Sequence, residues 1–215
     1  MKRMHLKPAI KGLYAITPDE LDTADLIRKT RLVLQGGATV LQYRNKLADA
    51  ALQLTQAKAL RQLTREFSTT FIVNDNVHLA VQVEADGVHL GGEDGSVVTA
   101  RQQLGTEKII GVSCYNRAPL ASEAELQGAD YIAFGAFFPS STKPNAIKAE
   151  ADLLRWARQH MKVPIVAIGG ITLQNAPLLI AAGADALAVI SAVFEAEDIQ
   201  ITAEQFSTLF KQGSA

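Results

Sequence analysis

Gly128-Ala129-Asp130-Tyr131, with the apolar residues 132–134 behind it, is one copy of a short pattern that recurs along the chain. Related copies are Gly-Ala-Thr-Val at 37–40, Glu-Ala-Asp-Gly-Val at 84–88 and Gly-Ala-Asp-Ala at 183–186. Each copy predicts a helix end followed by a strand, because glycine adopts the left-handed conformation that closes a helix. The pattern precedes every second predicted strand, which indicates alternate units of a closed array.

Eight short apolar or β-branched runs are predicted as strands, and segments with helical apolar spacing separate them. The predicted strands are 13–16, 39–43, 71–73, 87–90, 109–112, 131–134, 165–168 and 186–190. Strict alternation of strand and helix predicts parallel pairing with crossover helices. An open dinucleotide-binding sheet is disfavoured, because Thr17-Pro18-Asp19-Glu20 follows the first strand in place of Gly-x-Gly-x-x-Gly. The predicted fold is an α/β protein, a (β/α)8 TIM barrel.

The length of 215 residues and a hydrophobic content of 48% suit one domain over 1–215. We expect a basic N-terminal tail over 1–10, a last helix near 202–211 and a loose C-terminal tail over 212–215. No signal-peptide pattern and no apolar run long enough to span a bilayer is present, so we expect a soluble protein.

The charge balance excludes broad electrostatic recognition. Lys and Arg number 21 against 22 for Asp and Glu, so no field attracts nucleic acid or an anionic membrane, and phosphate recognition must be local. Cys114 is the single cysteine, which excludes an intrachain disulfide and agrees with a reducing compartment. We therefore expect a cytoplasmic location.

Chemistry in such barrels occurs at the C-terminal ends of the strands, and the second predicted strand ends in Gln42-Tyr43-Arg44-Asn45-Lys46. If the strand continues, Gln42, Arg44 and Lys46 point the same way. Two cations and an amide on one side suit a diphosphate, because arginine bonds two oxygens at once and lysine adds a compact charge. The alternative interpretation is a solvated strand end.

Two further strand ends carry acidic residues. Asn74-Asp75-Asn76 follows the third strand, and the segment 91–94, which ends in Asp94, follows the fourth. Asp75 and Asp94 are the candidate metal pair, since magnesium takes one or two carboxylates together with phosphate oxygens and water. The alternative for 74–76 is a helix cap, for which Asn76 is the better candidate.

The fifth strand ends at Ser113, which places a hydroxyl at the barrel mouth. The adjacent Cys114 is interpreted as a small packing residue and not as a nucleophile. His89, inside the fourth strand, is interpreted as a hydrogen-bonded core or rim residue and not as a base.

A second anion site is predicted around the last three strands. The loop 135–144 after the sixth strand holds three consecutive hydroxyl residues and Lys143, and loops of this kind close over anionic substrates. Gly170 follows the seventh strand and Ser191 the eighth, where glycine amides and a short helix commonly cradle a phosphate. A Ser-rich connector and a plain glycine turn are the alternatives.

From Leu13-Tyr14-Ala15-Ile16-Thr17 to Val189-Ile190-Ser191-Ala192, this ordered set of motifs resembles the thiamine phosphate synthase family. The resemblance implies a transferase that joins 4-amino-2-methyl-5-(diphosphooxymethyl)pyrimidine to thiazole phosphate. The products are thiamine phosphate, diphosphate and, from a carboxylated thiazole, CO2. Gly92, Tyr115 and Ser140 depart from the usual family residues, which are Gln, His and Thr.

The resemblance also assigns roles. The pyrimidine diphosphate would bind to Gln42, Tyr43, Arg44, Asn45, Lys46 and Asn74. Magnesium would bind to Asp75 and Asp94, and the departing diphosphate would meet Arg44, Ser113 and Lys143. The thiazole phosphate would bind to Ser140, Ser141, Thr142, Gly170, Ile190 and Ser191.

Two other functions compete with this one. A thiazole tautomerase is a similar barrel that handles the same thiazole phosphate but does not need Lys46, Asp75 and Asp94, so their presence favours the synthase. A non-catalytic barrel that binds a phosphorylated thiamine precursor would show binding without turnover. Oligomeric state and the choice between carboxylated and decarboxylated thiazole stay open.

Overall fold

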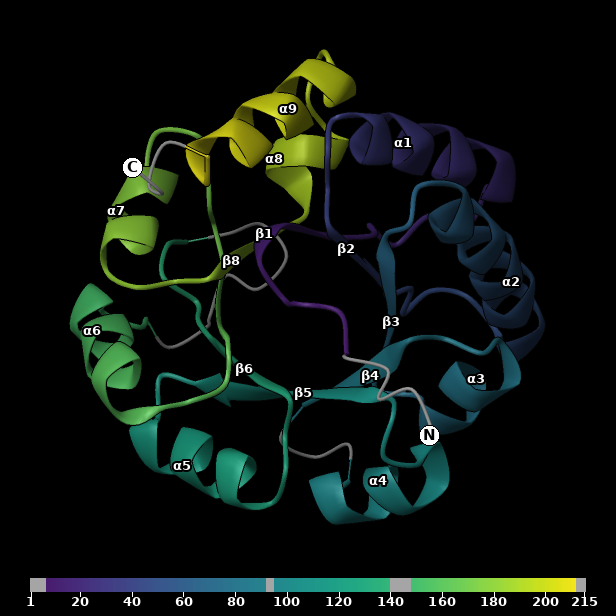
Figure 1. The fold of residues 1–215 in the computed structure, drawn as a ribbon. Coiled ribbons are helices and arrows are strands. Elements are labelled where there is room, and N and C mark those ends of the chain that lie inside the picture. Colours follow the sequence, from purple (N-terminus) through teal and green to yellow (C-terminus); the bar gives the residue numbers. More distant parts are fainter. Residues whose placement is uncertain (1–6, 92–94, 140–147, 212–215) are drawn as a thin grey trace, which may run out of the picture.

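The protein folds into a closed barrel of eight parallel strands in sequence order, with helices around the outside (Figure 1). The structure, a computed structural model, describes residues 7–91, 95–139 and 148–211. The strands are β1 Gly12–Ile16, β2 Val40–Tyr43, β3 Thr70–Asn74, β4 Gly87–Leu90, β5 Ile109–Tyr115, β6 Tyr131–Phe134, β7 Ile165–Ile168 and β8 Ala186–Val189. The (β/α)8 prediction is confirmed.

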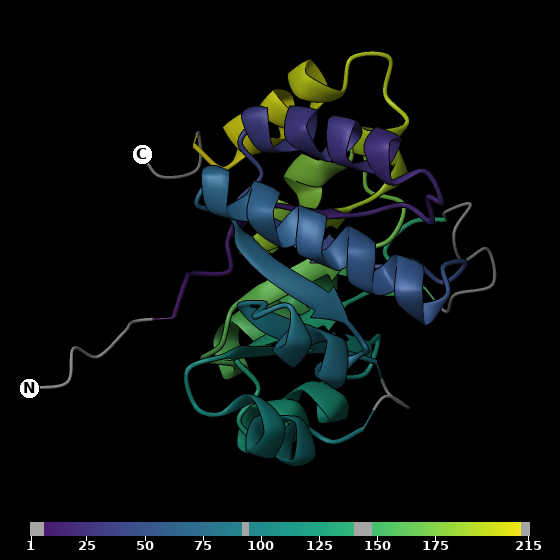
Figure 2. The same cartoon turned by 90° about the vertical axis from the view of Figure 1, so that its right-hand side faces the viewer.

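The crossover helices pack against the outer faces of the strands, and α1, α2 and α9 lie along one side of the wall (Figure 2). The helices are α1 Thr23–Gln35, α2 Ala50–Glu66, α3 Val77–Gln82, α4 Val97–Leu104, α5 Ala118–Leu126, α6 Ala151–His160, α7 Ala176–Ala181, α8 Ser191–Phe194 and α9 Ile199–Leu209. No helix within the described ranges has the length and apolarity needed to cross a membrane.

Alternate strand residues form two separate apolar cores. Along β2, Val40 belongs to the cluster inside the barrel, and Leu41 belongs to the larger cluster between strands and helices. The interior cluster also contains Tyr14 and Tyr131, both almost fully buried. Because successive side chains point to opposite faces of a strand, most strands supply residues to both cores, whereas the apolar residues of β4, Val88 and Leu90, belong only to the outer core.

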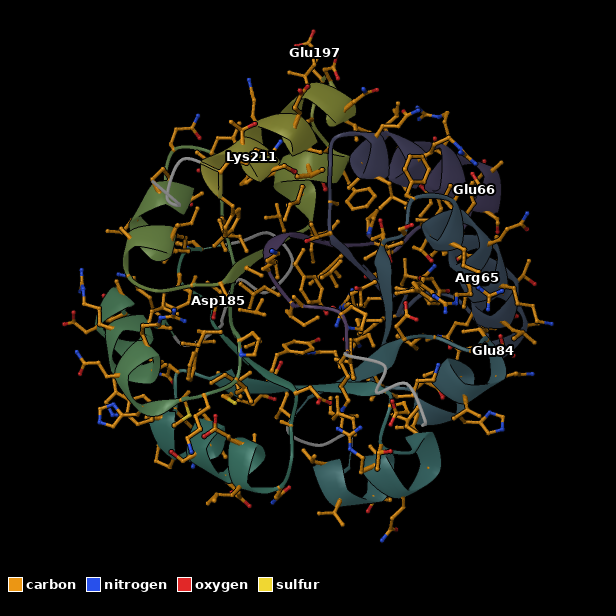
Figure 3. The ribbon with its side chains drawn as sticks, viewed as in Figure 1. Arg65, Glu66, Glu84, Asp185, Glu197 and Lys211 are labelled. Carbon is orange, nitrogen blue, oxygen red and sulfur yellow. The ribbon has the colours of Figure 1, made fainter. Side chains whose placement is uncertain are left out.

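The recurring pattern that predicted the fold acts at the N-terminal ends of the strands. Asp130 accepts a hydrogen bond from the backbone N–H of Ile110 in the preceding strand at 2.8 Å, and Arg101 of α4 bonds the same carboxylate at 2.6 Å. Asp86 and Asp185 repeat this arrangement with their own preceding strands and arginines. Each aspartate therefore ties two neighbouring strands and a helix together; Asp185 is labelled in Figure 3.

The predicted helix ends are also confirmed. Gly128 adopts a φ of +90°, and Glu84, at the corresponding position of the second copy, adopts a φ of +53°. Such values are strained for a residue with a side chain, which explains why glycine occupies this position in the other copies.

The last part of the predicted basic tail is packed onto the barrel. Ile10 is 3% exposed and belongs to the interior cluster, so it closes the N-terminal end of the barrel. Lys7 reaches Asp130 with an N–O distance of 2.6 Å. The predicted C-terminal tail over 212–215 lies outside the described residues.

Candidate active site

The end of β2 turns three of its five predicted binding residues toward the mouth. Gln42 follows Val40 on the inward face and is only 3% exposed. The Arg44 side chain is 15% exposed, whereas that of Lys46 is 60% exposed. The strand end therefore presents a graded series, from a buried amide to a solvent-accessible ammonium.

The side chains of Tyr43 and Asn45 turn the other way, toward α2. The Tyr43 hydroxyl donates to Oε1 of Gln56 at 2.8 Å, and the Asn45 amide donates to the same oxygen at 3.0 Å. Asn45 Oδ1 also accepts from the backbone N–H groups of residues 47 and 48. We expected substrate contacts from these two side chains, but the structure gives them partners behind the strand, where they hold the loop after β2 in shape.

The segment after β1 holds this cationic strand end. Asp19 accepts hydrogen bonds at 3.0 Å, on each carboxylate oxygen, from Nη1 of Arg44, and its Oδ1 accepts from the backbone N–H of Lys46 at 2.7 Å. Thr17, which is fully buried, exchanges hydrogen bonds with the backbone of Arg44. The sequence analysis used 17–20 only to exclude a glycine-rich loop and missed that this segment supports the end of β2. The position of 17–20 directly after a strand was the signal that could have revealed this role.

Asp75 and Asn76 divide the two roles that were proposed for the end of β3. Asn76 caps α3, because its Oδ1 accepts from the backbone N–H of Leu79 at 2.9 Å, as predicted. Asp75 has a φ of +59° and stands 3.7 Å from the Lys46 ammonium. Backbone strain at a non-glycine residue is common at functional sites, and here it sets a carboxylate beside a cation on the neighbouring strand end.

Asn74 is the last residue of β3 and is half-buried between the strand and the mouth. It pairs in register with His89 of β4, and the backbone N–H of Asp75 donates to the carbonyl of His89 at 2.8 Å. The ends of β2, β3 and β4 are thus joined by backbone and side-chain contacts.

Ser113 lies on the inward face of β5, half-buried, and its Oγ is 2.9 Å from Nε2 of His89. The prediction that His89 is a hydrogen-bonded residue is confirmed. β5 extends three residues beyond the predicted 109–112, with a register shift between Ser113 and Tyr115 that leaves Tyr115 at φ +53°. Cys114 is fully buried on the helix side, and burial raises the pKa of its thiol to about 12, as fits a packing residue.

Gly170 lies against the start of the loop after β6. A side chain at this position would meet the carbonyl oxygen of Pro139 at 2.3 Å, and the residue has a φ of +60°. The N–H of Phe138 donates to the carbonyl of Gly169 at 3.0 Å. Glycine is therefore required for close contact between two loops at the mouth. Ser140, Ser141, Thr142, Lys143 and Asp94 lie outside the described residues.

The chain after β8 turns directly into the four-residue helix α8, which begins at Ser191 after Ile190. The carbonyl of Ile190 accepts from the N–H groups of Val193 and Phe194. The predicted short helix after the last strand is present and begins directly beyond the C-terminal end of β8.

The described residues suit a magnesium ion that is held partly by substrate. Asp75 offers a hard carboxylate that the helix cap does not use, and magnesium binds through one or two carboxylates, phosphate oxygens and water. Within the described ranges, no group of three or more His, Cys, Asp or Glu side chains is gathered into a metal cage. Magnesium does not require such a cage.

The sequence model described as thiamine monophosphate synthase matches residues 13–193. The chain belongs to the thiamine monophosphate synthase family. It is 55% identical to a thiamine-phosphate synthase of Methylobacillus flagellatus, with 96% of this chain and 98% of the relative covered. A relative of that name from Nitrosospira multiformis is 53% identical, with 95% and 88% covered.

A solved structure agrees with this membership of the synthase family. Thiamine phosphate pyrophosphorylase from Pyrococcus furiosus superposes with a TM-score of 0.85 at 39% identity, covering 95% of this chain and 97% of that one. The correspondence therefore extends over nearly the whole chain.

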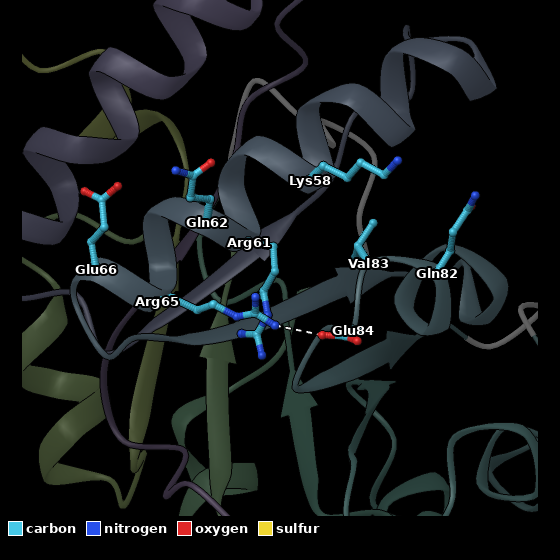
Figure 4. A pocket seen from close by; sticks show the side chains of 8 residues that line it. All are labelled: Lys58, Arg61, Gln62, Arg65, Glu66, Gln82, Val83 and Glu84. Atoms are coloured by element: carbon cyan, nitrogen blue, oxygen red, sulfur yellow. Dashed lines mark hydrogen bonds and ion pairs between the residues drawn. The ribbon is translucent and has the colours of Figure 1, made fainter.

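A cavity of about 590 Å3 lies away from these strand ends, on the outer wall (Figure 4). It is bordered by α2 and by the end of α3 with the segment after it, and both of its arginines form ion pairs. Arg65 bonds Glu84 at 2.8 Å across the cavity, and Arg61 bonds Asp86 at 2.8 Å. In a (β/α)8 enzyme of this family, such a position suits stability and not chemistry.

Proposed function

We propose that this chain is a transferase that makes thiamine phosphate from the pyrimidine diphosphate and thiazole phosphate, with diphosphate as the leaving group. The observation that carries the proposal is the junction of Arg44, Lys46 and Asp75 at adjacent strand ends, in a chain of this family. Two cations and a carboxylate beside one another suit a metal-bound diphosphate.

The β2 end would bind the diphosphate. Arg44 is held by Asp19, so little side-chain entropy is lost when the guanidinium meets phosphate oxygens. Lys46 is exposed and would add a positive charge, while the buried amide of Gln42 would face the pyrimidine. From the opposite side of the mouth, the Ser113 hydroxyl would donate a hydrogen bond to a diphosphate oxygen.

The chemistry requires a good leaving group and a positioned acceptor. The bond from the pyrimidine methylene carbon to the diphosphate oxygen breaks, and its electron pair leaves with the diphosphate. The electron-rich aminopyrimidine supports the cation at the methylene carbon until the thiazole nitrogen lone pair forms the new C–N bond. A site that is rich in cations serves this reaction, because it stabilises the departing negative charge and aligns the two reactants.

Asp75, together with Asp94, would hold magnesium. When bound, the ion supplies positive charge to the diphosphate oxygens and so makes the diphosphate a better leaving group. The Lys46 ammonium is 3.7 Å from the Asp75 carboxylate, so the proposed metal ligand lies next to the cations at the end of β2. Lys143 would add a further charge to the leaving group.

The thiazole phosphate would bind at the other side of the mouth. Gly170 and the backbone around Ile190 and Ser191 would supply N–H groups beyond β7 and at the start of α8, as in many phosphate-binding barrels. Ser140, Ser141 and Thr142 would complete this site from the loop after β6. We also propose a cytoplasmic location, which the single unpaired cysteine supports.

A product assay tests the proposed function against its two rivals. The protein is incubated with the pyrimidine diphosphate, carboxylated thiazole phosphate and magnesium, and products are separated by chromatography. We expect thiamine phosphate only when both substrates are present. Isomerisation of the thiazole phosphate alone, without condensation, would identify a tautomerase, and binding of either substrate without any product would identify a binding protein.

A further inference from the structure

A chain of polar side chains runs through the interior of the barrel to the mouth. The hydroxyl oxygens of Tyr14 and Tyr131 are 2.8 Å apart. The Tyr131 hydroxyl is 2.9 Å from Nδ1 of His89, and Nε2 of His89 is 2.9 Å from Oγ of Ser113. These four residues come from β1, β6, β4 and β5, and we call them the interior relay.

Packing fixes the interior relay in place. Tyr14 and Tyr131 are at most 1% exposed and His89 is 9% exposed. The rings of His89 and Tyr131 stack, with centroids 5.5 Å apart and planes 24° apart. The Tyr131 hydroxyl lies over Gly111, where a side-chain carbon would be 2.4 Å from that oxygen and 1.9 Å from Cζ. Glycine at 111 is therefore the residue that admits the tyrosine.

Burial also keeps both tyrosines protonated. It raises the pKa of Tyr14 and of Tyr131 well above the ordinary value, so both hydroxyls keep their protons at every pH at which the protein is expected to work. Each hydroxyl thus has one proton to donate and can also accept.

The number of protons restricts how the interior relay can be arranged. A neutral imidazole donates from one ring nitrogen and accepts at the other. If Nδ1 of His89 accepts, Tyr131 must donate to it, Tyr14 must donate to Tyr131, and Nε2–H donates to Ser113. The proton of Ser113 is then available for a group at the mouth. In the opposite tautomer Nε2 accepts from Ser113 and Nδ1–H donates to Tyr131, so one of the two buried tyrosine hydroxyl protons has no acceptor within the interior relay.

We propose that the interior relay holds His89 in the Nε2–H tautomer, so that the Ser113 hydroxyl is a committed donor toward the mouth. His89 and Tyr131 are then positioning residues that act through Ser113. The inference rests on the proposed function, in which Ser113 meets the diphosphate. Diphosphate oxygens only accept, so a serine that donates is useful there and one that accepts is not.

Nitrogen-15 NMR of the histidine rings tests the proposed tautomer without any turnover. Spectra are recorded on the full chain with and without magnesium and inorganic diphosphate, and the His89→Gln variant assigns the signal of His89 among those of His5, His78 and His160. We expect His89 to be protonated at Nε2 only in both states. Protonation at Nδ1, alone or together with Nε2, overturns the proposal.

Kinetics of two tyrosine variants tests the positioning role. Tyr131→Phe deprives Nδ1 of its donor, and we expect kcat to fall about tenfold while KM for the pyrimidine diphosphate stays within about twofold, which is the scale of one hydrogen bond. Tyr14→Phe is the matched control, because Tyr131 still donates to His89; its kcat should stay within about threefold of wild type. Equal losses in the two variants, or a loss confined to KM, overturn the proposal.

These outcomes separate failure of the interior relay from failure of the proposed function. If the wild-type protein forms no thiamine phosphate, the function fails and the NMR result still decides the tautomer. If the wild-type protein is active and Tyr131→Phe matches Tyr14→Phe, only the positioning role fails. Circular dichroism and the thermal midpoint of each variant show that the fold is retained.

Discussion

Neighbouring residues at the end of β3 allow a matched test of the metal side of the site. Asp75→Asn removes a carboxylate charge but keeps a residue that tolerates the left-handed conformation, which is +59° in φ here. The ion pair that is lost joins Lys46 to Asp75 at 3.7 Å, with side chains 60% and 29% exposed. Such an exposed pair contributes about 0.5 kcal/mol or less, so the thermal midpoint should fall by no more than about 2 °C.

The expected activity of Asp75→Asn is very different. If Asp75 holds magnesium against the diphosphate, we expect kcat/KM to fall about a hundredfold or more, which corresponds to about 3 kcal/mol of transition-state stabilisation. Asn76→Ala is the control next to it: losing the α3 cap should cost about 1 kcal/mol of stability and leave kcat within about threefold. The assay is steady-state release of diphosphate, with thermal unfolding measured on the same preparations.

Two results would refute this reasoning. If Asp75→Asn keeps more than about a third of the wild-type kcat/KM at saturating magnesium, Asp75 is not part of the metal site. If instead Asp75→Asn unfolds far below wild type while Asn76→Ala does not, Asp75 is the structural residue and the assignment of the two roles is reversed.

Other parts of the structure predict further outcomes. Gly170→Ala places a carbon 2.3 Å from the Pro139 carbonyl oxygen, so we expect KM for thiazole phosphate to rise at least fivefold; an unchanged KM would contradict a role for this contact. Asp130→Ala leaves the N–H of Ile110 without its acceptor and removes an arginine partner, and urea unfolding should show a loss of about 2–4 kcal/mol; a loss below about 1 kcal/mol would contradict the account. Burial raises the pKa of the Cys114 thiol from about 9 to about 12, so the thiol loses its proton at a lower pH in the unfolded chain than in the folded protein. The free energy of unfolding should therefore fall as pH rises between those values. Urea titrations at pH 8 and pH 10.5 check this direction, and a Cys114→Ala variant should show a smaller decrease.

The sequence predicted the fold well because its strongest signals are local and repeated. The Gly-Ala-Asp pattern marks helix ends, and the structure shows that Asp130 and its equivalents also bridge neighbouring strands. β4, β6 and β7 have the predicted limits. The longer β5 was not predicted, because its last residues are placed by a register shift against β6 near Ser113 and not by their own apolar pattern.

The candidate site was predicted in outline but not in its supporting contacts. Residues that follow a strand were found by position, and alternation predicted Gln42, Arg44 and Lys46 on one side; in the structure Arg44 pairs with Asp19 and Lys46 with Asp75, each beyond a neighbouring strand end. The hydrogen bond from Arg44 to Asp19 joins residues that are 25 positions apart in the sequence, and the one between Tyr14 and Tyr131 joins residues that are 117 apart. Pairings across the barrel depend on the register of the strands, which no single strand pattern specifies.

One measurement tests the central claim most directly. Phosphorus-31 NMR follows a single sample that contains the protein, the pyrimidine diphosphate, thiazole phosphate and magnesium. The account predicts that free diphosphate and thiamine phosphate appear together in a one-to-one ratio, and that removing magnesium with a chelator stops both until the metal is restored. Persistence of both substrate signals in the complete mixture, with folded protein, would contradict it.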